Sequence, residues 1–297
     1  MRIFLYTVLA LFGFALNSIL CRMALRGEEA DAVGFTVIRL FAGAVGLVII
    51  STLASLNETQ PVRSVFKRGS WLSAFLLFAY AICFSLAYVD LTAGTGALIL
   101  FGSVQLTMII ASLVQGERPK LVEWIGLLVA AGGLTYLLLP GFESPPIKTA
   151  GLMAAAGVAW GFYTLRGKMS RDPLGSTAGN FVRAVPMISV VAIFFLSRIV
   201  LTGNGLILAM VSGAIASGVG YAFWYAALKH HSSIRAAILQ LPVPILTAFL
   251  GIAFLDEVMT QRLLIASALI LGGIGLAIVS RGGEKKGRRR RLIPRED

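Results

Sequence analysis

The chain has 297 residues, of which 57% are hydrophobic and 13% are charged, and its formal net charge is +12. Soluble domains carry about 25% charged residues, and a soluble chain of this length could not cover so much apolar surface with polar groups. The composition therefore excludes an ordinary soluble protein and indicates a membrane protein. The positive charge lies in loops and in residues 284–291, which favours contact with anionic lipid and argues against nucleic-acid binding.

Ten apolar runs have close to the roughly 20 residues that cross a bilayer as a helix. The first leads into Cys21-Arg22 without a small-residue cleavage site, so we expect a retained span and not a signal peptide. Turns with helix-breaking residues, such as Pro61 and Pro119, separate the runs. In chain order the predicted spans are 3–21, 33–54, 71–89, 95–114, 122–139, 151–169, 180–201, 205–228, 234–254 and 263–280.

Basic residues predict the orientation of these spans. Most of the 26 Lys and Arg residues fall on the side shared by the two termini. The opposite side carries Arg22, Arg26, Lys148, Arg198 and Arg262. Because cytoplasmic loops are enriched in Lys and Arg, we expect both termini in the cytoplasm.

The second half of the chain repeats the first. A shift of 140 residues places Ala87 on Ala227, Glu117 on Glu257 and Gly132-Gly133 on Gly272-Gly273. The predicted units are a five-helix repeat over residues 1–145, a second over 146–281, and a basic cytoplasmic tail over 282–297. Since five is odd, the halves are expected to have inverted topology, an arrangement that places a solute path at the repeat interface near the midplane. The predicted fold is an all-α integral membrane protein of ten transmembrane helices.

Several motifs carry a resemblance to a known family. Residues 32–39 (AVGFTVIR) open the second span, residues 93–98 (AGTGAL) open the fourth, and Gly116-Glu117 is echoed by Asp256-Glu257. In this order the motifs resemble the EamA branch of the drug/metabolite transporter superfamily, and most of all the YddG-type amino acid exporters. The resemblance implies a ten-span exporter of the bacterial inner membrane that is built from two inverted repeats. The chain departs from it by having Phe12-Gly13 in place of Trp-Gly and Val104 opposite Pro244.

Polar and aromatic residues within the spans are the candidates for a solute site, because polar groups in a bilayer face the bundle interior. Aromatic side chains recur at helical spacing, as in Trp160 and Tyr163, and would suit a solute with an apolar or aromatic side chain. Interhelical hydrogen bonding or ordinary packing is the alternative for each. The candidates are Phe12, Asn17, Tyr80, Phe84, Ser103, Gln105, Trp160, Tyr163, Trp224 and Gln240.

Charged residues and prolines in the spans are expected to have structural roles. Arg39 and Arg183 match each other in the two halves, and we interpret them as ties to backbone carbonyls, with a carboxylate clamp as the alternative. Glu117 and Glu257 are expected in the first turn of the following helix. Pro242 and Pro244 interrupt the ninth span and predict a hinge there.

These features favour a carrier over other classes. No His lies mid-span and no HExxH or paired-acid pattern occurs, so an enzyme, a metal site and a cofactor are not expected. The predicted function is export of small metabolites, above all aromatic or other apolar amino acids, by alternating access. Another solute class, such as a drug or nucleotide sugar, moved by proton antiport is the alternative. The expected partners are the solute and anionic lipid at the tail, and the expected state is a monomer or weak homodimer.

Overall fold

The computed structural model describes residues 2–55, 68–114, 121–141, 144–170, 172–228 and 239–291, and helices account for nearly all of them. An isolated antiparallel bridge pairs Ala30 with Leu201. The elements are α1 (Arg2–Arg26), α2 (Ala32–Ser55), α3 (Trp71–Ala87), α4 (Ala93–Val114), α5 (Leu121–Leu138), α6 (Ile147–Lys168), α7 (Pro173–Phe195), η2 (Leu196–Arg198), α8 (Gly203–Val211), η3 (Ser212–Val219), α9 (Gly220–Leu228), α11 (Pro242–Leu255) and α12 (Gln261–Arg291).

The largest differences from the predicted spans lie in the seventh, the ninth and the tenth. The seventh span begins earlier, at Pro173, because the Asp172 side chain accepts a hydrogen bond from the Gly175 amide and Pro173 suits the first helical position. In the ninth, α11 begins at Pro242 after helical residues 239–240 and a turn at Leu241, and the predicted start at residue 234 lies outside the described residues. The helix α12 continues to Arg291, so the first part of the predicted tail extends the last helix.

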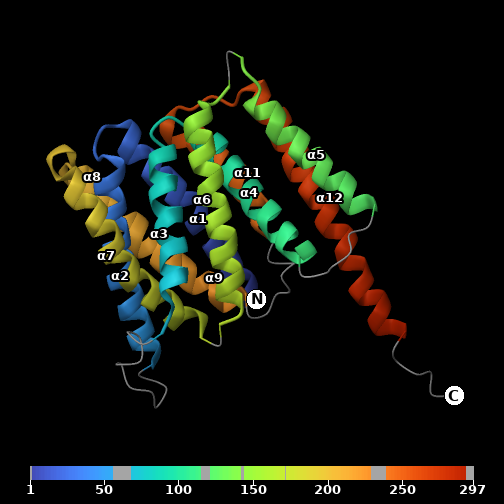
Figure 1. Cartoon of the computed structure of the whole chain (residues 1–297), viewed down its shortest axis with the longest axis horizontal. Helices are drawn as coiled ribbons and strands as arrows, with labels where there is room; N and C mark the ends of the chain where they lie inside the picture. The colour runs from blue at the N-terminus through green and yellow to red at the C-terminus, as the bar shows by residue number, and fades with distance from the viewer. Residues whose placement is uncertain are drawn as a thin grey trace.

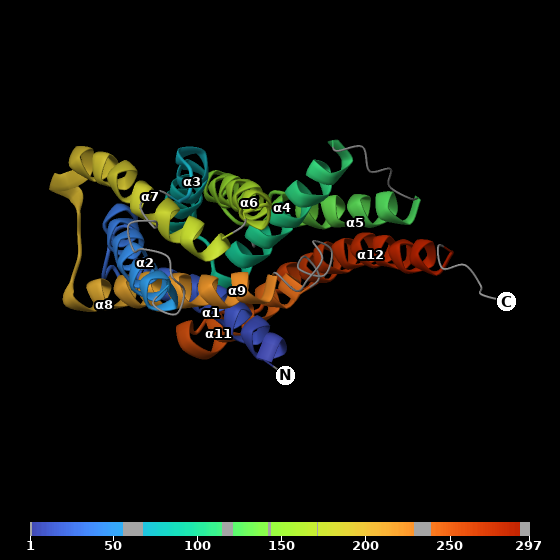
Figure 2. The same cartoon turned by 90° about the horizontal axis from the view of Figure 1, so that it is seen from below.

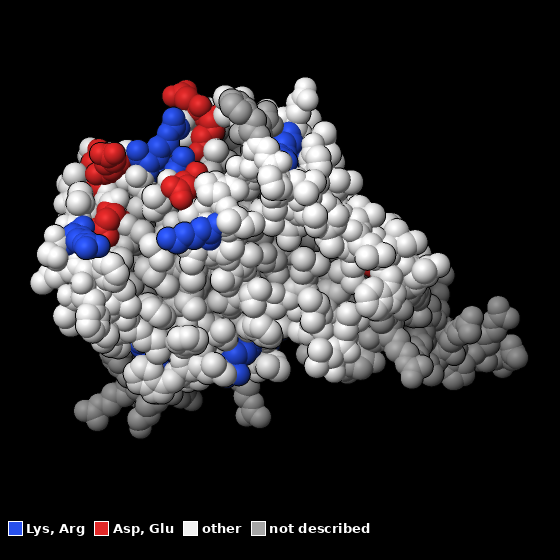
Figure 3. Space-filling view, turned by 45° about the horizontal axis from the view of Figure 1, so that its top comes forward, with Lys and Arg blue, Asp and Glu red and all other residues white. Residues whose placement is uncertain are grey.

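Apolar side chains lie on the outside of the bundle as well as in its core. Six helical segments in the described ranges are long and apolar enough to cross a membrane, and three more apolar helices are shorter. Large apolar side chains are exposed on outer faces, including Phe194 at 80% and Leu121 at 75%. Figure 3 shows that charged side chains gather at one end while the visible belt below is nearly free of them. This distribution is what contact with lipid requires.

The helices form a main bundle with one helix pair beside it (Figures 1 and 2). Within the bundle, α6 packs against α3 and α4, while α1 packs against α9, η3 and α11. The helix α2 packs against α7 and η3. The separate pair is α5 with α12, which lie side by side in both views. The start of α1 and the end of α12 both lie in the lower half of Figure 1.

Glycines allow the α5–α12 pair to approach closely. A Cβ added at Gly126 would lie 2.5 Å from the Gly273 carbonyl oxygen, and one added at Gly273 would lie 2.5 Å from that of Gly126. The neighbouring Gly132 and Gly272 have nothing within 4 Å of such an atom. Small residues therefore set the separation of these two helices, as is common in membranes.

Candidate functional site

A small cavity lies at the centre of the main bundle. Its walls come from α1, α3, α4, α6 and α9, and the volume is about 10 Å³, enough for roughly one water molecule. Binding pockets for small organic ligands have about 300–1,000 Å³. The bundle is thus closed around this site in the conformation described. The lining residues are Phe14, Asn17, Ser18, Tyr80, Phe84, Leu100, Phe101, Trp160 and Tyr221.

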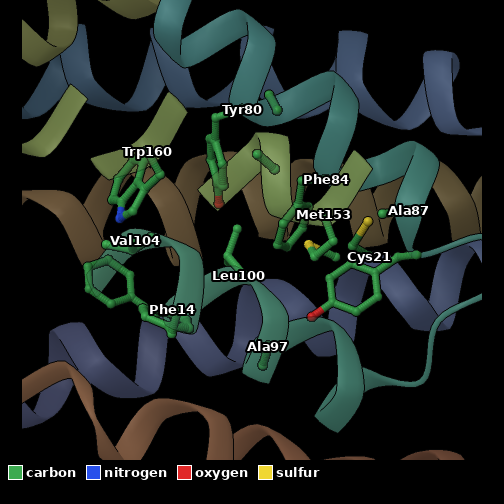
Figure 4. Packing of buried hydrophobic residues seen from close by; sticks show 14 of the residues in the cluster. Phe14, Cys21, Tyr80, Phe84, Ala87, Ala97, Leu100, Val104, Met153 and Trp160 are labelled. Atoms are coloured by element: carbon green, nitrogen blue, oxygen red, sulfur yellow. The ribbon is translucent and has the colours of Figure 1, made fainter. Parts of the chain in front are cut away.

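Trp160 is the centre of the aromatic wall. Its ring centroid lies 4.8 Å from that of Tyr80, 4.9 Å from that of Tyr221 and 6.1 Å from that of Phe14. Figure 4 shows Trp160, Tyr80, Phe14 and Leu100 around the same space, although they come from four different helices. Such a wall offers ring faces and edges to an apolar or aromatic group.

Polar atoms occupy the other part of the cavity wall. The Asn17 amide nitrogen donates to the Tyr80 hydroxyl at 3.4 Å, and the Ser212 hydroxyl donates to the Asn17 side-chain oxygen at 2.6 Å. Tyr80 also accepts from Nη2 of Arg39 at 3.1 Å. Tyr80 thereby joins the aromatic wall to a buried polar cluster.

Arg39 is 1% exposed and lies directly behind this wall. Its Nε donates to the Ser217 hydroxyl at 3.5 Å. The guanidinium carbon lies 4.9 Å from the Phe84 ring centroid and 5.2 Å from that of Tyr80. No carboxylate of the described residues lies within 4.0 Å of it. The interpretation of Arg39 as a tie to backbone carbonyls therefore does not match its surroundings, which are hydroxyls and rings.

A π-helical stretch, η3, packs against the Arg39 segment and was not expected from the sequence. A Cβ added at Gly213 would lie 2.2 Å from the Arg39 carbonyl oxygen, so only glycine permits this approach. The stretch also supplies the buried Ser212 and Ser217 hydroxyls to the polar cluster. Long π-helical turns are rare and occur at functional sites more often than elsewhere. The small residues of 212–218 are the one sequence signal for it.

An ion pair closes the end of the bundle that carries Arg22. Arg22 Nε lies 3.2 Å from Glu257 Oε1, and its Nη1 donates to the carbonyls of Tyr88 and Val89. Glu257 Oε2 accepts from the Ala93 amide at 2.8 Å, at the start of α4. The prediction for Glu257 was thus wrong in one respect, because the helix it caps is α4 and not the following α12. Through these contacts Arg22 joins α1 to the end of α11.

The other predicted site residues lie at varying distances from the cavity. Tyr163 and Trp224 are buried behind the wall, with ring centroids 5.4 Å from Trp160 and 5.6 Å from Phe14 respectively. Phe12 is 46% exposed on the outside of α1, so the prediction chose the wrong face, and Phe14 lines the cavity instead. Ser103, Gln105 and Gln240 are buried but do not line the cavity. Ser103 lies at the α4–α6 contact, where a Cβ on Gly157 would be 2.6 Å from its own.

The predicted hinge lies at a helix start and not within a helix. Pro242 is the first residue of α11 and Pro244 the third, where the missing amide protons have no intrahelical acceptor to lose. Residues 239–240 are helical and Leu241 forms a turn between them and α11. The chain therefore has a break at Leu241, and the prolines begin the helix that follows it.

Arg183 lies in a setting unlike that of Arg39. Its Nη1 donates to the carbonyls of Arg68 at 2.5 Å and Gly179 at 2.9 Å, and its guanidinium lies over the Trp71 ring. These contacts match the proposed tie to backbone carbonyls. Glu117 and the His230-His231 pair lie outside the described residues. Within those residues, no group of three or more His, Cys, Asp or Glu side chains could hold a metal ion.

Comparison with known proteins assigns the chain to a class. The model of the EamA-like transporter family matches residues 1–139 and 147–279. A protein of Pseudomonas aeruginosa is 47% identical over 282 residues, covering 95% of this chain and 96% of its own. The aromatic amino acid exporter YddG of Ancylobacter novellus is 23% identical over 278 residues, covering 84% and 97%. A solved crystal structure matches with a TM-score of 0.66 at 19% identity, covering 93% of this chain and 98% of that one.

The fold and these matches define a multi-pass membrane transporter, and not an enzyme. The chain belongs to the EamA-like transporter family. The resemblance drawn from the sequence motifs is thereby confirmed.

Proposed function

We propose that this transporter exports amino acids with aromatic or other apolar side chains across a bacterial inner membrane. The observation that carries the proposal is the central cavity, where the rings of Trp160, Tyr80 and Tyr221 meet the Asn17 amide. Ring faces stack on an apolar or aromatic side chain, and amides and hydroxyls bind the polar end of an amino acid. The name of the Ancylobacter novellus relative, an aromatic amino acid exporter, agrees with this chemistry.

We further propose that the chain contains two inverted five-helix repeats, with both termini in the cytoplasm. The packing supports this, because contacts occur in pairs that exchange the halves: α3 with α6 matches α9 with α1, and α4 with α6 matches α11 with α1. The pairs α2–α7, α4–α11 and α5–α12 join equivalent helices. Alternating access then consists of one repeat moving against the other around the cavity.

The closed cavity fits an occluded state of such a cycle. At one end, Arg22 and Glu257 join α1, α4 and α11. At the other, Arg166 donates to the Ser73 hydroxyl at 3.0 Å and joins α6 to α3. A solute of amino-acid size would enter only after one of these ends separates, since the cavity of about 10 Å³ does not admit it.

Uptake into proteoliposomes tests the proposal. Purified protein is reconstituted, and entry of labelled tryptophan is measured alone and with an excess of each of a panel of unlabelled amino acids. We expect saturable entry that aromatic and branched apolar amino acids inhibit and that aspartate and lysine do not. Entry no faster than in protein-free liposomes, for tryptophan and for every other amino acid tried as the labelled solute, would overturn the assignment.

A further inference from the structure

Arg39 has an incomplete set of partners. Its Nη2 and Nε donate to the hydroxyls of Tyr80 and Ser217, whereas Nη1 is buried with no hydrogen-bond partner among the described residues. The residue lies in α2, within the apolar thickness of the bundle, and is 1% exposed. A buried cation without an anion is unfavourable, and in transporters such residues mark the solute or ion path.

Other arginines in the described part of the chain show what a satisfied guanidinium looks like here. Arg22 pairs with Glu257 and Arg68 pairs with Asp172. Arg183 donates to two backbone carbonyls. The partners of Arg39 are neutral hydroxyls and the ring faces of Tyr80 and Phe84. Arg39 therefore has neither the carboxylate nor the backbone carbonyls that these arginines have, and an anion would both accept from Nη1 and balance the buried charge.

The position of Arg39 connects this missing anion to the cavity. Tyr80 and Phe84 line the cavity, and the Arg39 guanidinium also lies over both of their rings. The Tyr80 hydroxyl accepts from both Arg39 and Asn17, which places it where an acidic oxygen would be held. Rotation of the Tyr80 side chain would free Nη2 of Arg39, which together with the unpartnered Nη1 would give two donors behind the cavity wall.

We infer that Arg39 binds the carboxylate of the transported solute, and that the Tyr80 hydroxyl occupies this place when the site is empty. A planar guanidinium matches a carboxylate with two parallel hydrogen bonds. The solute side chain then lies against Trp160, and its ammonium group faces the Asn17 oxygen and the ring faces. The inference rests on the proposed function and deepens it, because it makes a free carboxylate a requirement for transport.

Binding to the wild-type protein tests this requirement without any mutation. Displacement of labelled tryptophan from the purified transporter is measured with phenylalanine, phenylalaninamide and 3-phenylpropionate. We expect the amide to bind at least about tenfold more weakly than phenylalanine, because a site built for a charged group is left unpaired by a neutral one. Equal displacement of tryptophan by phenylalaninamide and by phenylalanine would overturn the inference and leave the proposed function standing.

3-Phenylpropionate, which has a carboxylate but no ammonium group, shows whether the carboxylate site can stand when amino-acid export fails. If 3-phenylpropionate stabilises the protein against heating in a manner that depends on Arg39, while no amino acid binds, the carboxylate site stands and amino-acid export fails.

Substitution of the two arginines supplies a matched pair. Arg39→Met keeps a side chain of similar length and removes the buried charge. We expect this variant to melt, without ligand, at a temperature no lower than that of wild type. It should bind phenylalanine and phenylalaninamide equally well. Arg183→Met, the equivalent change in the second half, should lower the melting temperature and keep the discrimination. An Arg39→Met protein that is folded and still prefers the acid would contradict the inference.

Discussion

Gly157 on α6 controls how closely this helix approaches α4, and replacing it tests whether packing positions the cavity. A Cβ at Gly157 would lie 2.5 Å from the Leu100 carbonyl oxygen and 2.6 Å from the Ser103 Cβ. Ordinary contacts begin at 3.4 Å, so Gly157→Ala must separate the two helices by about 0.9 Å locally. The glycine lies one turn before Trp160, and Leu100 itself lines the cavity.

The magnitude follows from two opposing effects. Alanine improves helix stability by up to about 1 kcal/mol relative to glycine. Overpacking of a close contact costs about 1–3 kcal/mol. Gly151, on the same helix, has nothing within 4 Å of an added Cβ, and Gly151→Ala is therefore the matched control. The gain in helix stability is the same in both variants and cancels, so we expect Gly157→Ala to be less stable than Gly151→Ala by the overpacking cost of about 1–3 kcal/mol.

The assay is the melting temperature in detergent, followed by tryptophan uptake into proteoliposomes. A difference of this size corresponds to about 2–5 °C in the melting temperature of a chain of this length. Gly157→Ala should also take up tryptophan more slowly at a temperature where it remains folded, because the Trp160 wall is displaced. Equal melting temperatures for the two variants, or a more stable Gly157→Ala, would refute the packing argument.

Three further predictions concern topology, closure and coupling. Cysteines introduced by Thr202→Cys and Gly287→Cys should react with an impermeant thiol reagent from outside and inside the cell respectively, and the reverse pattern would remove the inverted-repeat proposal. Glu257→Gln removes the anion opposite Arg22, and breaking a buried pair costs about 3–5 kcal/mol. Hydrogen exchange of the backbone amides at the facing ends of α1 and α4 should therefore accelerate. Unchanged exchange would show that the pair does not hold this end closed. In liposomes the solute should equilibrate without accumulating when a pH difference is imposed, and accumulation abolished by a protonophore would make the buried Glu123 the first residue to test.

The sequence predicted the helices well, because length and apolarity alone decide whether a segment can cross a bilayer. It did less well on which face of a helix turns inward. Lipid is as apolar as the protein core, so hydrophobic periodicity does not distinguish the two faces. Phe12 and Phe14 are two residues apart on α1, and nothing in their pattern shows that Phe14 is the one facing Trp160.

Long-range polar contacts were the other part that the sequence did not reveal. Glu257 was expected at the start of a helix, and it does cap one, but the amide it binds belongs to Ala93, far away in the chain. The different surroundings of Arg39 and Arg183 were hidden by their matched positions in the two halves. A repeat predicts equivalent positions in the fold, whereas the partners at those positions come from segments that have diverged.

Photolabelling tests most directly whether the central cavity binds an aromatic amino acid. Purified protein is irradiated with a photoreactive phenylalanine derivative, with and without excess tryptophan, and the modified residues are identified by mass spectrometry. Modification of Tyr80 and Trp160 that tryptophan prevents, with none at the outward-facing Phe12 and Trp71, is the predicted result. Protected modification elsewhere in the chain, with Tyr80 and Trp160 unlabelled, would contradict the assignment of the cavity as the solute site.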